Sequence, residues 1–301
     1  MKIERIKNYK IKVIPNSTHV PIQVEEMPTK HFLALLCAKR GSGKSNLVGN
    51  LMDRYQGSWD IVKAICPTIE SNYALYSNFL DPENDVYENA NDSSLIEFID
   101  MIENEKLAYE RYEDDWKSWK MLQKELKIKN ASVIDPDLLM KFYDEPTDTF
   151  IKPYHEWSEK TGGEPRKPDI CLIVDDCMCN PILNGRLFRN FIIRHRHVHG
   201  IGTSVITTCQ AWRAQGGVPR VLRTNATFVC IWKTQNPAEL KTILEECSGE
   251  VSPDIFATIY DYATKESKHD FLLVDFHAKK EHPSAFRKNL DEFIIPDNIK
   301  G

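Results

Sequence analysis

The sequence of 301 residues has no long hydrophobic run. No window approaches the roughly 18 consecutive apolar residues that a membrane-spanning helix needs, so we expect no membrane partner. The opening residues, Met1-Lys2-Ile3-Glu4-Arg5, also lack the apolar core of a secretory signal. We therefore expect a protein that works in cytoplasm or in an equivalent space.

The chain has no excess of positive charge either. It carries 39 basic and 44 acidic residues, for a formal net charge of −5. This is the wrong sign for a protein that coats nucleic acid non-specifically. The balance does not exclude a motor that holds DNA through a few residues lining a pore.

A disulfide framework is absent as well. Of the eight cysteines, five lie inside or beside apolar runs, where cysteine acts as a small hydrophobic residue: Cys37, Cys66, Cys171, Cys209 and Cys230. This usage is typical of a reducing compartment.

What the sequence does contain is an alternation of short apolar runs with helical patterns. The runs are rich in Val, Ile and Leu with little polar alternation, as in strands buried on both faces of a parallel sheet. We expect strands at Phe32–Cys37, Ile61–Cys66, Ile170–Val174, Ser204–Thr208 and Thr227–Trp232, with a sixth candidate at Asp270–Phe276. We expect helices at Lys44–Arg54, Asn184–His197, Pro237–Ser248 and Ser252–Thr264. The alternation predicts a three-layer α/β fold in a single domain, residues 1–301.

One segment, residues 93–168, breaks this pattern. From Ser93 to Lys127 the apolar residues recur at steps of three and four, which is typical of a long amphipathic helix or part of a helical hairpin. The remainder is rich in Pro, Gly and acidic residues. We interpret residues 93–168 as a charged helical insertion between core strands two and three. We expect it to cover the sheet; the alternative is a protruding arm that contacts a neighbour or partner.

A glycine loop follows the first expected strand and precedes the first expected helix. In this context Gly41 and Gly43 allow backbone N–H groups to surround a β-phosphate, Lys44 reaches the β- and γ-phosphates, and the Ser45 hydroxyl coordinates Mg²⁺. The helix start adds its positive dipole end. Ala38 stands where the strict pattern has glycine, which is the smallest change available. The expected nucleotide-binding residues are Ala38, Lys39, Arg40, Gly41, Ser42, Gly43, Lys44, Ser45 and Asn46.

Two carboxylates follow the expected strand Ile170–Val174. A phosphate loop needs a second metal anchor on a neighbouring strand, so we expect Asp175 to hold Mg²⁺, directly or through water. Asp176 is then placed to act as the general base that deprotonates the attacking water. This pair favours hydrolysis of ATP over transfer to a small-molecule acceptor.

A glutamine closes the next expected strand. Gln210 follows Ser204–Thr208, and in a RecA-like sheet this strand brings a polar residue to the γ-phosphate. We expect Gln210 to sense that phosphate or to orient the water. A glutamine that only forms a turn is the alternative.

These residues together resemble the viral genome-packaging ATPases of the FtsK–HerA superfamily, found in poxviruses, giant viruses and virophages. The resemblance rests on Ala38–Ser45, Ile170–Asp176, the run Arg194-His195-Arg196-His197, Ser204–Gln210 and Val218–Ala226. It implies a RecA-like P-loop ATPase whose mostly parallel sheet is flanked by helices. It also implies a homo-oligomeric ring, a pentamer or hexamer, that pumps double-stranded DNA into a preformed capsid.

Further expectations follow from the resemblance. Such rings complete each active site with an arginine from the neighbouring subunit, for which Arg196, Arg194 and Arg223 are candidates in that order and Arg40 is a fourth. The ring would dock on a capsid portal or vertex protein, in the host cytoplasm at the virus factory or on the virion. Two other functions stay open: a P-loop nucleoside or nucleotide kinase, and an assembly factor that binds ATP without hydrolysing it.

Overall fold

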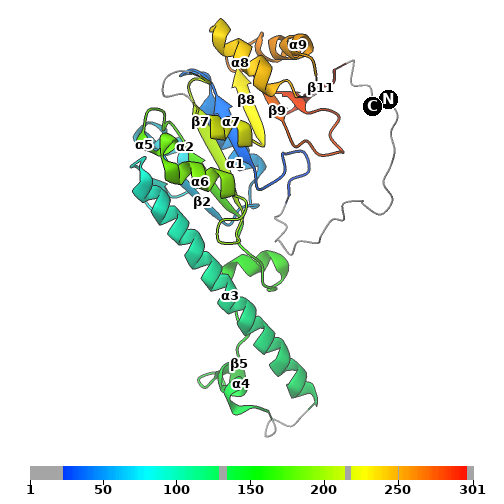
Figure 1. The fold of residues 1–301 in the computed structure, drawn as a ribbon. Coiled ribbons are helices and arrows are strands. Elements are labelled where there is room, and N and C mark those ends of the chain that lie inside the picture. Colours follow the sequence, from blue (N-terminus) through cyan, green and yellow to red (C-terminus); the bar gives the residue numbers. More distant parts are fainter. Residues whose placement is uncertain (1–22, 129–133, 214–217, 250, 297–301) are drawn as a thin grey trace, which may run out of the picture.

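A nine-stranded mixed β-sheet forms the centre of the protein (Figure 1). The computed structural model describes residues 23–128, 134–213, 218–249 and 251–296. The strands lie in the order β11-β10-β9-β8-β1-β7-β6-β2-β3. From β8 to β3 all neighbours pair in parallel, whereas β9, β10 and β11 pair antiparallel at one side. The strands are β1 (Leu33–Cys37), β2 (Ile61–Ile65), β3 (Val86–Tyr87), β6 (Ile170–Val174), β7 (Thr203–Cys209), β8 (Phe228–Trp232), β9 (Phe271–Asp275), β10 (Phe286–Lys288) and β11 (Glu292–Ile294).

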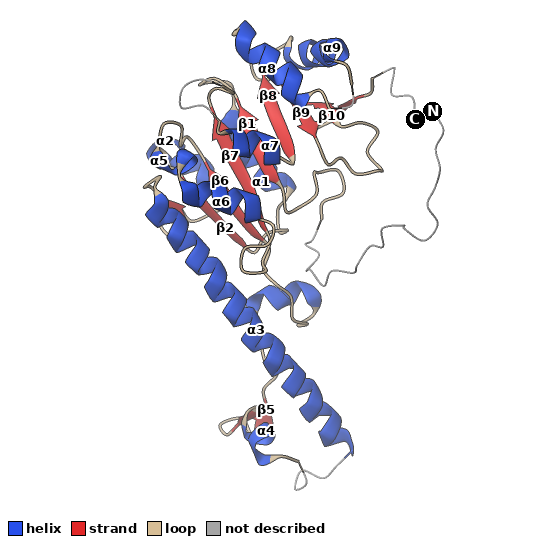
Figure 2. Cartoon of the chain, viewed as in Figure 1, coloured by secondary structure: helices blue, strands red, loops and turns tan. Residues whose placement is uncertain are grey.

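Helices cover both faces of this sheet (Figure 2). Successive residues of a strand point to opposite faces, so Leu33 and Leu35 pack into one hydrophobic cluster while Ala34 and Leu36 pack into the other. One face is covered by α1 (Lys44–Arg54) and α2 (Ile69–Tyr76). The other is covered by the start of α3 (Asp92–Ile128) and by α5 (Pro181–Asn184), α6 (Arg186–Arg194), α7 (Arg220–Asn225), α8 (Pro237–Cys247) and α9 (Pro253–Thr264). The predicted α/β class, with a mostly parallel central sheet flanked by helices, is confirmed.

All six expected strands are present, each within one or two residues of its predicted ends. Short strands β3, β10 and β11 were not expected. The helix expected over Asn184–His197 is wrong in its bounds, because Gly185 is extended and separates α5 from α6. The helix then ends at Arg194. The buried ring of His195 bonds to the Thr203 carbonyl at 2.7 Å, which fixes the residue after the helix against the start of β7.

The insertion is only partly a cover, which corrects the expectation for residues 93–168. The first turns of α3 bury Leu95, Phe98 and Ile102 in the core of the sheet face. The rest of this 37-residue helix projects away from the sheet as an arm (Figure 1). The insertion begins after the short strand β3, close to its expected start.

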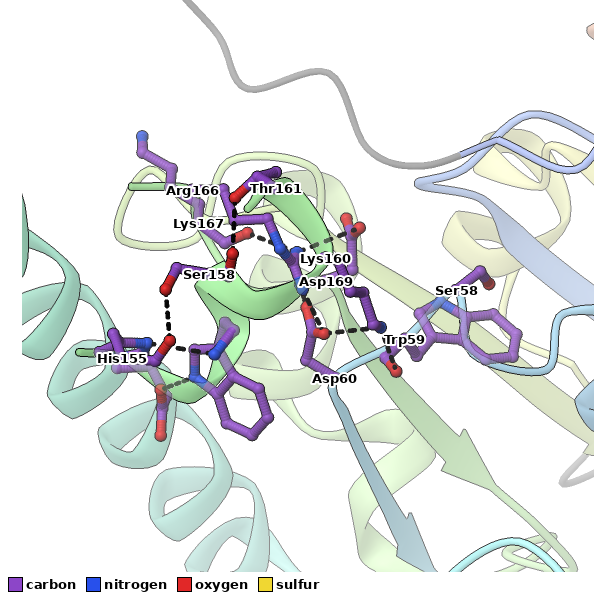
Figure 3. Close-up of polar contacts among 12 residues, drawn as sticks. Ser58, Trp59, Asp60, His155, Ser158, Lys160, Thr161, Arg166, Lys167 and Asp169 are labelled. Atoms are coloured by element: carbon purple, nitrogen blue, oxygen red, sulfur yellow. Dashed lines mark hydrogen bonds and ion pairs between the residues drawn. The ribbon is translucent and has the colours of Figure 1, made fainter. Parts of the chain in front are cut away.

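A return segment braces the arm near its middle. It contains the 3₁₀ helix η2 (Glu156–Thr161), and Trp157 Nε1 donates to Glu105 of α3 at 2.8 Å. Tyr112 of α3 donates its hydroxyl to the Gly163 carbonyl at 2.7 Å and accepts from Ser158 at 3.2 Å. Figure 3 shows how this segment reaches the start of β2.

The tip of the arm has a small hydrophobic cluster of its own. Leu122 packs there with Ile134, Leu138 and Phe142, around α4 (Pro136–Met140) and the hairpin of β4 (Tyr143–Asp144) and β5 (Thr149–Phe150). None of these residues belongs to the two clusters beside the sheet. The tip is therefore a separate packing unit.

Cysteine packing agrees with the sequence: the eight thiols are free, and all but Cys179 are buried. Among the described residues, no helix is both long enough and apolar enough to span a membrane.

Candidate nucleotide-binding site

The glycine loop lies between β1 and α1, at the carboxyl edge of the parallel strands. Gly41 and Gly43 have φ values of +78° and +96°, a region that favours glycine. At Gly43 a Cβ would also lie 3.4 Å from Nδ1 of His269. The predicted strand–loop–helix arrangement is present, and the loop leads directly into the first turn of α1.

Lys44 begins that helix and folds back over the loop. Its Nζ donates to the carbonyls of Ala38 at 2.5 Å and Lys39 at 3.1 Å. An ammonium has three donors, so one stays available for a phosphate oxygen. Burial lowers the pKa of Lys44, and the negative groups around it, Asp175 and Asp176 among them, partly oppose that effect.

Asp175 lies directly after β6 and is only 2% exposed. One carboxylate oxygen accepts from Thr208 at 2.5 Å and the other from Tyr76 at 2.9 Å. These two donors fix the carboxylate, while each oxygen keeps a further lone pair. The carboxylate lines the pocket and is held in one orientation.

Asp176 is half-buried and has a φ of +52°, which is uncommon for a residue other than glycine. Gln210 donates to one of its oxygens at 2.9 Å and Thr68 to the other at 3.2 Å. Its backbone N–H donates to the Thr208 hydroxyl at 3.1 Å. Asp176 and Gln210, which were each expected near the γ-phosphate, are thus in contact, and Gln210 orients the carboxylate.

One pocket of about 580 Å³ joins these groups, a volume in the usual range for a small-molecule site. Its lining includes most of the residues expected from the sequence, namely Arg40, Gly41, Gly43, Lys44, Ser45, Asn46, Asp175, Asp176 and Gln210. Of the other expected residues, Ala38 is buried, Lys39 is exposed, and Ser42 lines an adjoining cavity.

The three leading finger candidates lie away from this pocket. Arg196 donates to Thr227, which precedes β8 at the amino edge of the strands, and the five residues of β1 separate that edge from the loop by about 16 Å. Arg194 ends α6 beside the same edge, and Arg223 forms an ion pair with Glu246 at 2.6 Å. Within one subunit, only Arg40 of the four candidates lines the pocket.

The sequence did not point to five residues that line the pocket, Thr68, Ser71, Asn72, Thr208 and His269, nor to Tyr76, which holds Asp175 from behind it. Thr68 and Thr208 lie at the carboxyl ends of β2 and β7, so the reasoning that selected Asp175 and Gln210 would have found them. Tyr76 reaches Asp175 from α2, and His269 reaches the Ser42 carbonyl at 3.2 Å from the loop before β9. No local pattern marks those two contacts.

A second cavity of about 430 Å³ adjoins the first. The two share Gly43, Asn46 and His269. Apolar side chains such as Leu47 and Leu290 line the second cavity together with Asn50 and Asn289. The combined space has room for more than the phosphates of a nucleotide.

The donor set fits Mg²⁺. Ser45 and Asp175 offer hydroxyl and carboxylate oxygens, the hard ligands that this ion prefers. Asp175 lines the pocket and would hold the ion either directly or through water. When bound, the ion neutralises charge on the β- and γ-phosphate oxygens.

No family model and no curated protein matches the sequence. In fold, the chain is similar to the genome packaging NTPase B204 from Sulfolobus turreted icosahedral virus 2, with 13% identity, a TM-score of 0.46, and 88% of this chain and 98% of that chain covered. It is also similar to EssC (ATPases 2 and 3) from Geobacillus thermodenitrificans, with 14% identity, a TM-score of 0.46, and 90% and 41% of the two chains covered. A third likeness is to the cytoplasmic domain of the Thermomonospora curvata type VII secretion ATPase EccC, with 16% identity, a TM-score of 0.38, and 82% and 24% covered. All three are distant likenesses of fold.

Proposed function

We propose that this chain is a Mg²⁺-dependent ATPase that translocates double-stranded viral DNA into a preformed capsid. The observation that carries the ATPase part is one pocket in which Lys44 faces the held carboxylates Asp175 and Asp176. A phosphate loop alone binds nucleotide. The oriented, half-buried Asp176 adds a group that can accept a proton from water.

In the proposed reaction, backbone amides of the loop and the Lys44 ammonium hold the β- and γ-phosphates. The water oxygen bonds to the γ-phosphorus as the bond to the β–γ bridging oxygen breaks, and ADP and phosphate leave. Asp176 accepts the proton of the water, while Gln210 and Thr68 keep its carboxylate in place. Orientation of this kind can lower the barrier substantially without any covalent intermediate.

DNA translocation, ring assembly and capsid docking rest on the sequence resemblance to packaging ATPases. The motifs that support them are Ile170–Asp176, the Arg-His run after α6, and Ser204–Gln210. The proposed assembly is a pentameric or hexameric ring that docks on a capsid portal or vertex protein. Its proposed location is the host cytoplasm or the virion.

We further propose that Arg196, or else Arg194 or Arg223, acts on the site of the neighbouring subunit. Arg194 and Arg196 are exposed and lie far from their own pocket, as a residue that acts across an interface should. Mixing Arg196→Ala subunits with Lys44→Ala subunits tests this. An intact Arg196 beside an intact Lys44 then occurs at some interfaces, so activity should partly return; no recovery means that Arg196 acts only within its own subunit.

The deciding measurement is phosphate release from ATP with and without double-stranded DNA. DNA-stimulated release supports the motor, transfer of phosphate to a nucleoside identifies a kinase, and tight ATP binding without turnover identifies an assembly factor.

Lys44→Ala should abolish nucleotide binding or turnover. Asp176→Asn should keep ATP binding and lose hydrolysis; normal turnover in that variant would contradict the assignment of the base.

A further inference from the structure

The distribution of charge along the chain is strongly uneven. Residues 177–238 contain none of the 44 acidic residues, although about one residue in seven is acidic in the whole chain. The same stretch holds eight of the 39 basic residues, namely Arg186, Arg189, Arg194, Arg196, Arg213, Arg220, Arg223 and Lys233. The remainder has 31 basic residues against 44 acidic ones, so it is much more negative than the net charge of −5 suggests.

Helix α6 carries the outermost part of this stretch. Its inner face buries Phe188, Phe191 and Ile192 against the core. Its outer face consists of Arg186, Arg189, Asn190, Ile193 and Arg194, all of them exposed. Figure 1 shows α6 in front of the sheet, between α3 and α7, and α7 brings the exposed Arg220.

Most arginines of this surface form no ion pair with a carboxylate of the described residues. Among the residues that the structure describes, Arg223 pairs with Glu246, but no carboxylate forms an ion pair with Arg186, Arg189, Arg194 or Arg220. Arg189 donates only to the carbonyl of Asn184. Each guanidinium therefore keeps donors for an external anion.

We propose that the outer surface of α6 and the start of α7 binds the phosphodiester backbone of double-stranded DNA. Arg186 and Arg194 are separated by about 12 Å along the helix axis, which is too far for one small anion but suits a polymer with repeated charges. The proposal rests on the proposed translocating function and adds to it the surface that holds the DNA.

Two observations select a duplex backbone over other partners. Single strands are held by exposed aromatic rings on which bases stack. In the described part of residues 177–238 every Phe and Trp is buried, and Ile193 is the one large hydrophobic side chain that is exposed. A protein partner would call for an apolar interface core, whereas DNA interfaces are polar and strongly positive.

The remainder of the chain is negatively charged, with 31 basic and 44 acidic residues. Its net charge repels phosphates, which favours contact with DNA at this surface over contact elsewhere. A few contacts with backbone phosphates carry no sequence information, which allows a motor to move along the duplex.

The test compares Arg186→Gln/Arg189→Gln with Lys241→Gln/Lys280→Gln, which removes the same charge from exposed positions elsewhere. Neither pair includes a candidate finger residue. The probe is a fluorescein-labelled random-sequence duplex, followed by anisotropy from low to moderate KCl. We expect the arginine pair to lower affinity at least about tenfold and to reduce the slope of log K against log salt by about 2, because each lost phosphate contact removes about 0.9. The lysine pair should keep the wild-type slope, and the melting temperatures show whether both variants are folded.

Each contrary result has its own meaning. If the wild-type chain binds the duplex and the arginine pair keeps the same slope, the surface is assigned wrongly while the DNA function survives. If the arginine pair instead changes the molecular mass in light scattering at an unchanged slope, the surface holds a second copy and the proposal is overturned. If the wild-type chain binds no duplex, the DNA function itself fails, and the surface assignment with it.

Discussion

Asp175 accepts one hydrogen bond on each carboxylate oxygen, from Thr208 and from Tyr76. Thr208 also accepts from the backbone N–H of Asp176. One hydroxyl therefore links the carboxylate of Asp175 to the backbone of Asp176. Groups of this kind tune a metal ligand by holding its orientation.

Thr208→Val should therefore weaken Mg²⁺ binding at the site. We expect the Mg²⁺ concentration needed for half-maximal ATPase activity to rise about 10- to 100-fold, because Asp175 loses a positioning donor. A buried acceptor left with one donor fewer should also lower stability by about 1–3 kcal/mol. The control is Thr207→Val: the Thr207 hydroxyl is buried without a hydrogen-bond partner, so its loss should change neither quantity. Equal effects of the two variants would show that the hydrogen bonds of the Thr208 hydroxyl do not hold the site.

His195 gives a second residue-scale prediction, on pH. Burial lowers its pKa to about 4, and the neutral ring donates from Nδ1 to the Thr203 carbonyl. In the unfolded chain the value is near 6.5, so the unfolded state binds more protons between these limits. The stabilisation is thus complete above pH 6.5 and is lost as pH falls toward 4, by about 3 kcal/mol in total.

Denaturant unfolding at pH 7, 6, 5 and 4 measures this loss. His195→Gln removes the titrating group, so its stability should fall less over the same range. His197→Gln, two residues away and exposed, should keep the wild-type profile. Parallel profiles for wild type and His195→Gln would place the acid sensitivity elsewhere.

At the scale of elements, the sequence predicted most of what is local. Buried strands and the helix after the glycine loop carry strong patterns, and so β1, α1, β6 and β7 are close to their expected bounds. Strands β3 and β11 are too short, and too exposed, for their residues to show a periodic pattern. The extended backbone of Gly185 and the bond from the His195 ring to Thr203 set the ends of α6, and a periodic pattern reveals neither.

The insertion shows the same limit. A stripe at steps of three and four predicts a long helix, and α3 is that helix. The stripe does not reveal what covers it: Leu95 meets the sheet, Tyr112 meets the return segment, and Leu122 meets the tip. Because α3 packs against three different partners along its length, only its first turns cover the sheet and the rest projects as an arm.

Asp60 is the point at which the return segment joins the sheet (Figure 3). Its carboxylate is 1% exposed, pairs with Lys160 at 2.8 Å and with Arg166, and accepts from the Asp169 N–H at 2.8 Å. Asp60→Asn removes the charge and leaves the buried Arg166 guanidinium without compensation on that side. We expect a loss of about 3–5 kcal/mol in the free energy of unfolding.

The matched control is Asp261→Asn, which breaks the exposed pair with Lys233 and should cost about 1 kcal/mol or less. Chemical denaturation measures both. A cost for Asp60→Asn as small as that of the control would mean that the brace does not depend on this charge.

At the scale of the whole molecule, two units share one helix. The catalytic pocket depends on the sheet and on α1, whereas the arm tip packs only on itself. Leu95 and Leu122 make this division testable, because both are leucines of α3 with 0% exposure, one at each end. Replacing either leucine with alanine should therefore destabilise a different part of the molecule.

Leu95→Ala should lower the global free energy of unfolding by about 2–5 kcal/mol, since it leaves a cavity in the main core. Leu122→Ala should instead open only the tip, because a small cluster can unfold locally while the sheet persists. Hydrogen exchange should then accelerate at residues 134–142 but not in β1 or β6, and ATPase activity should be kept. If Leu122→Ala lowers the melting temperature of the sheet as much as Leu95→Ala does, the arm and the sheet form one cooperative unit. If activity is retained while the tip unfolds locally, the sheet does not need the tip for its own stability. The tip is then available for contacts outside the subunit.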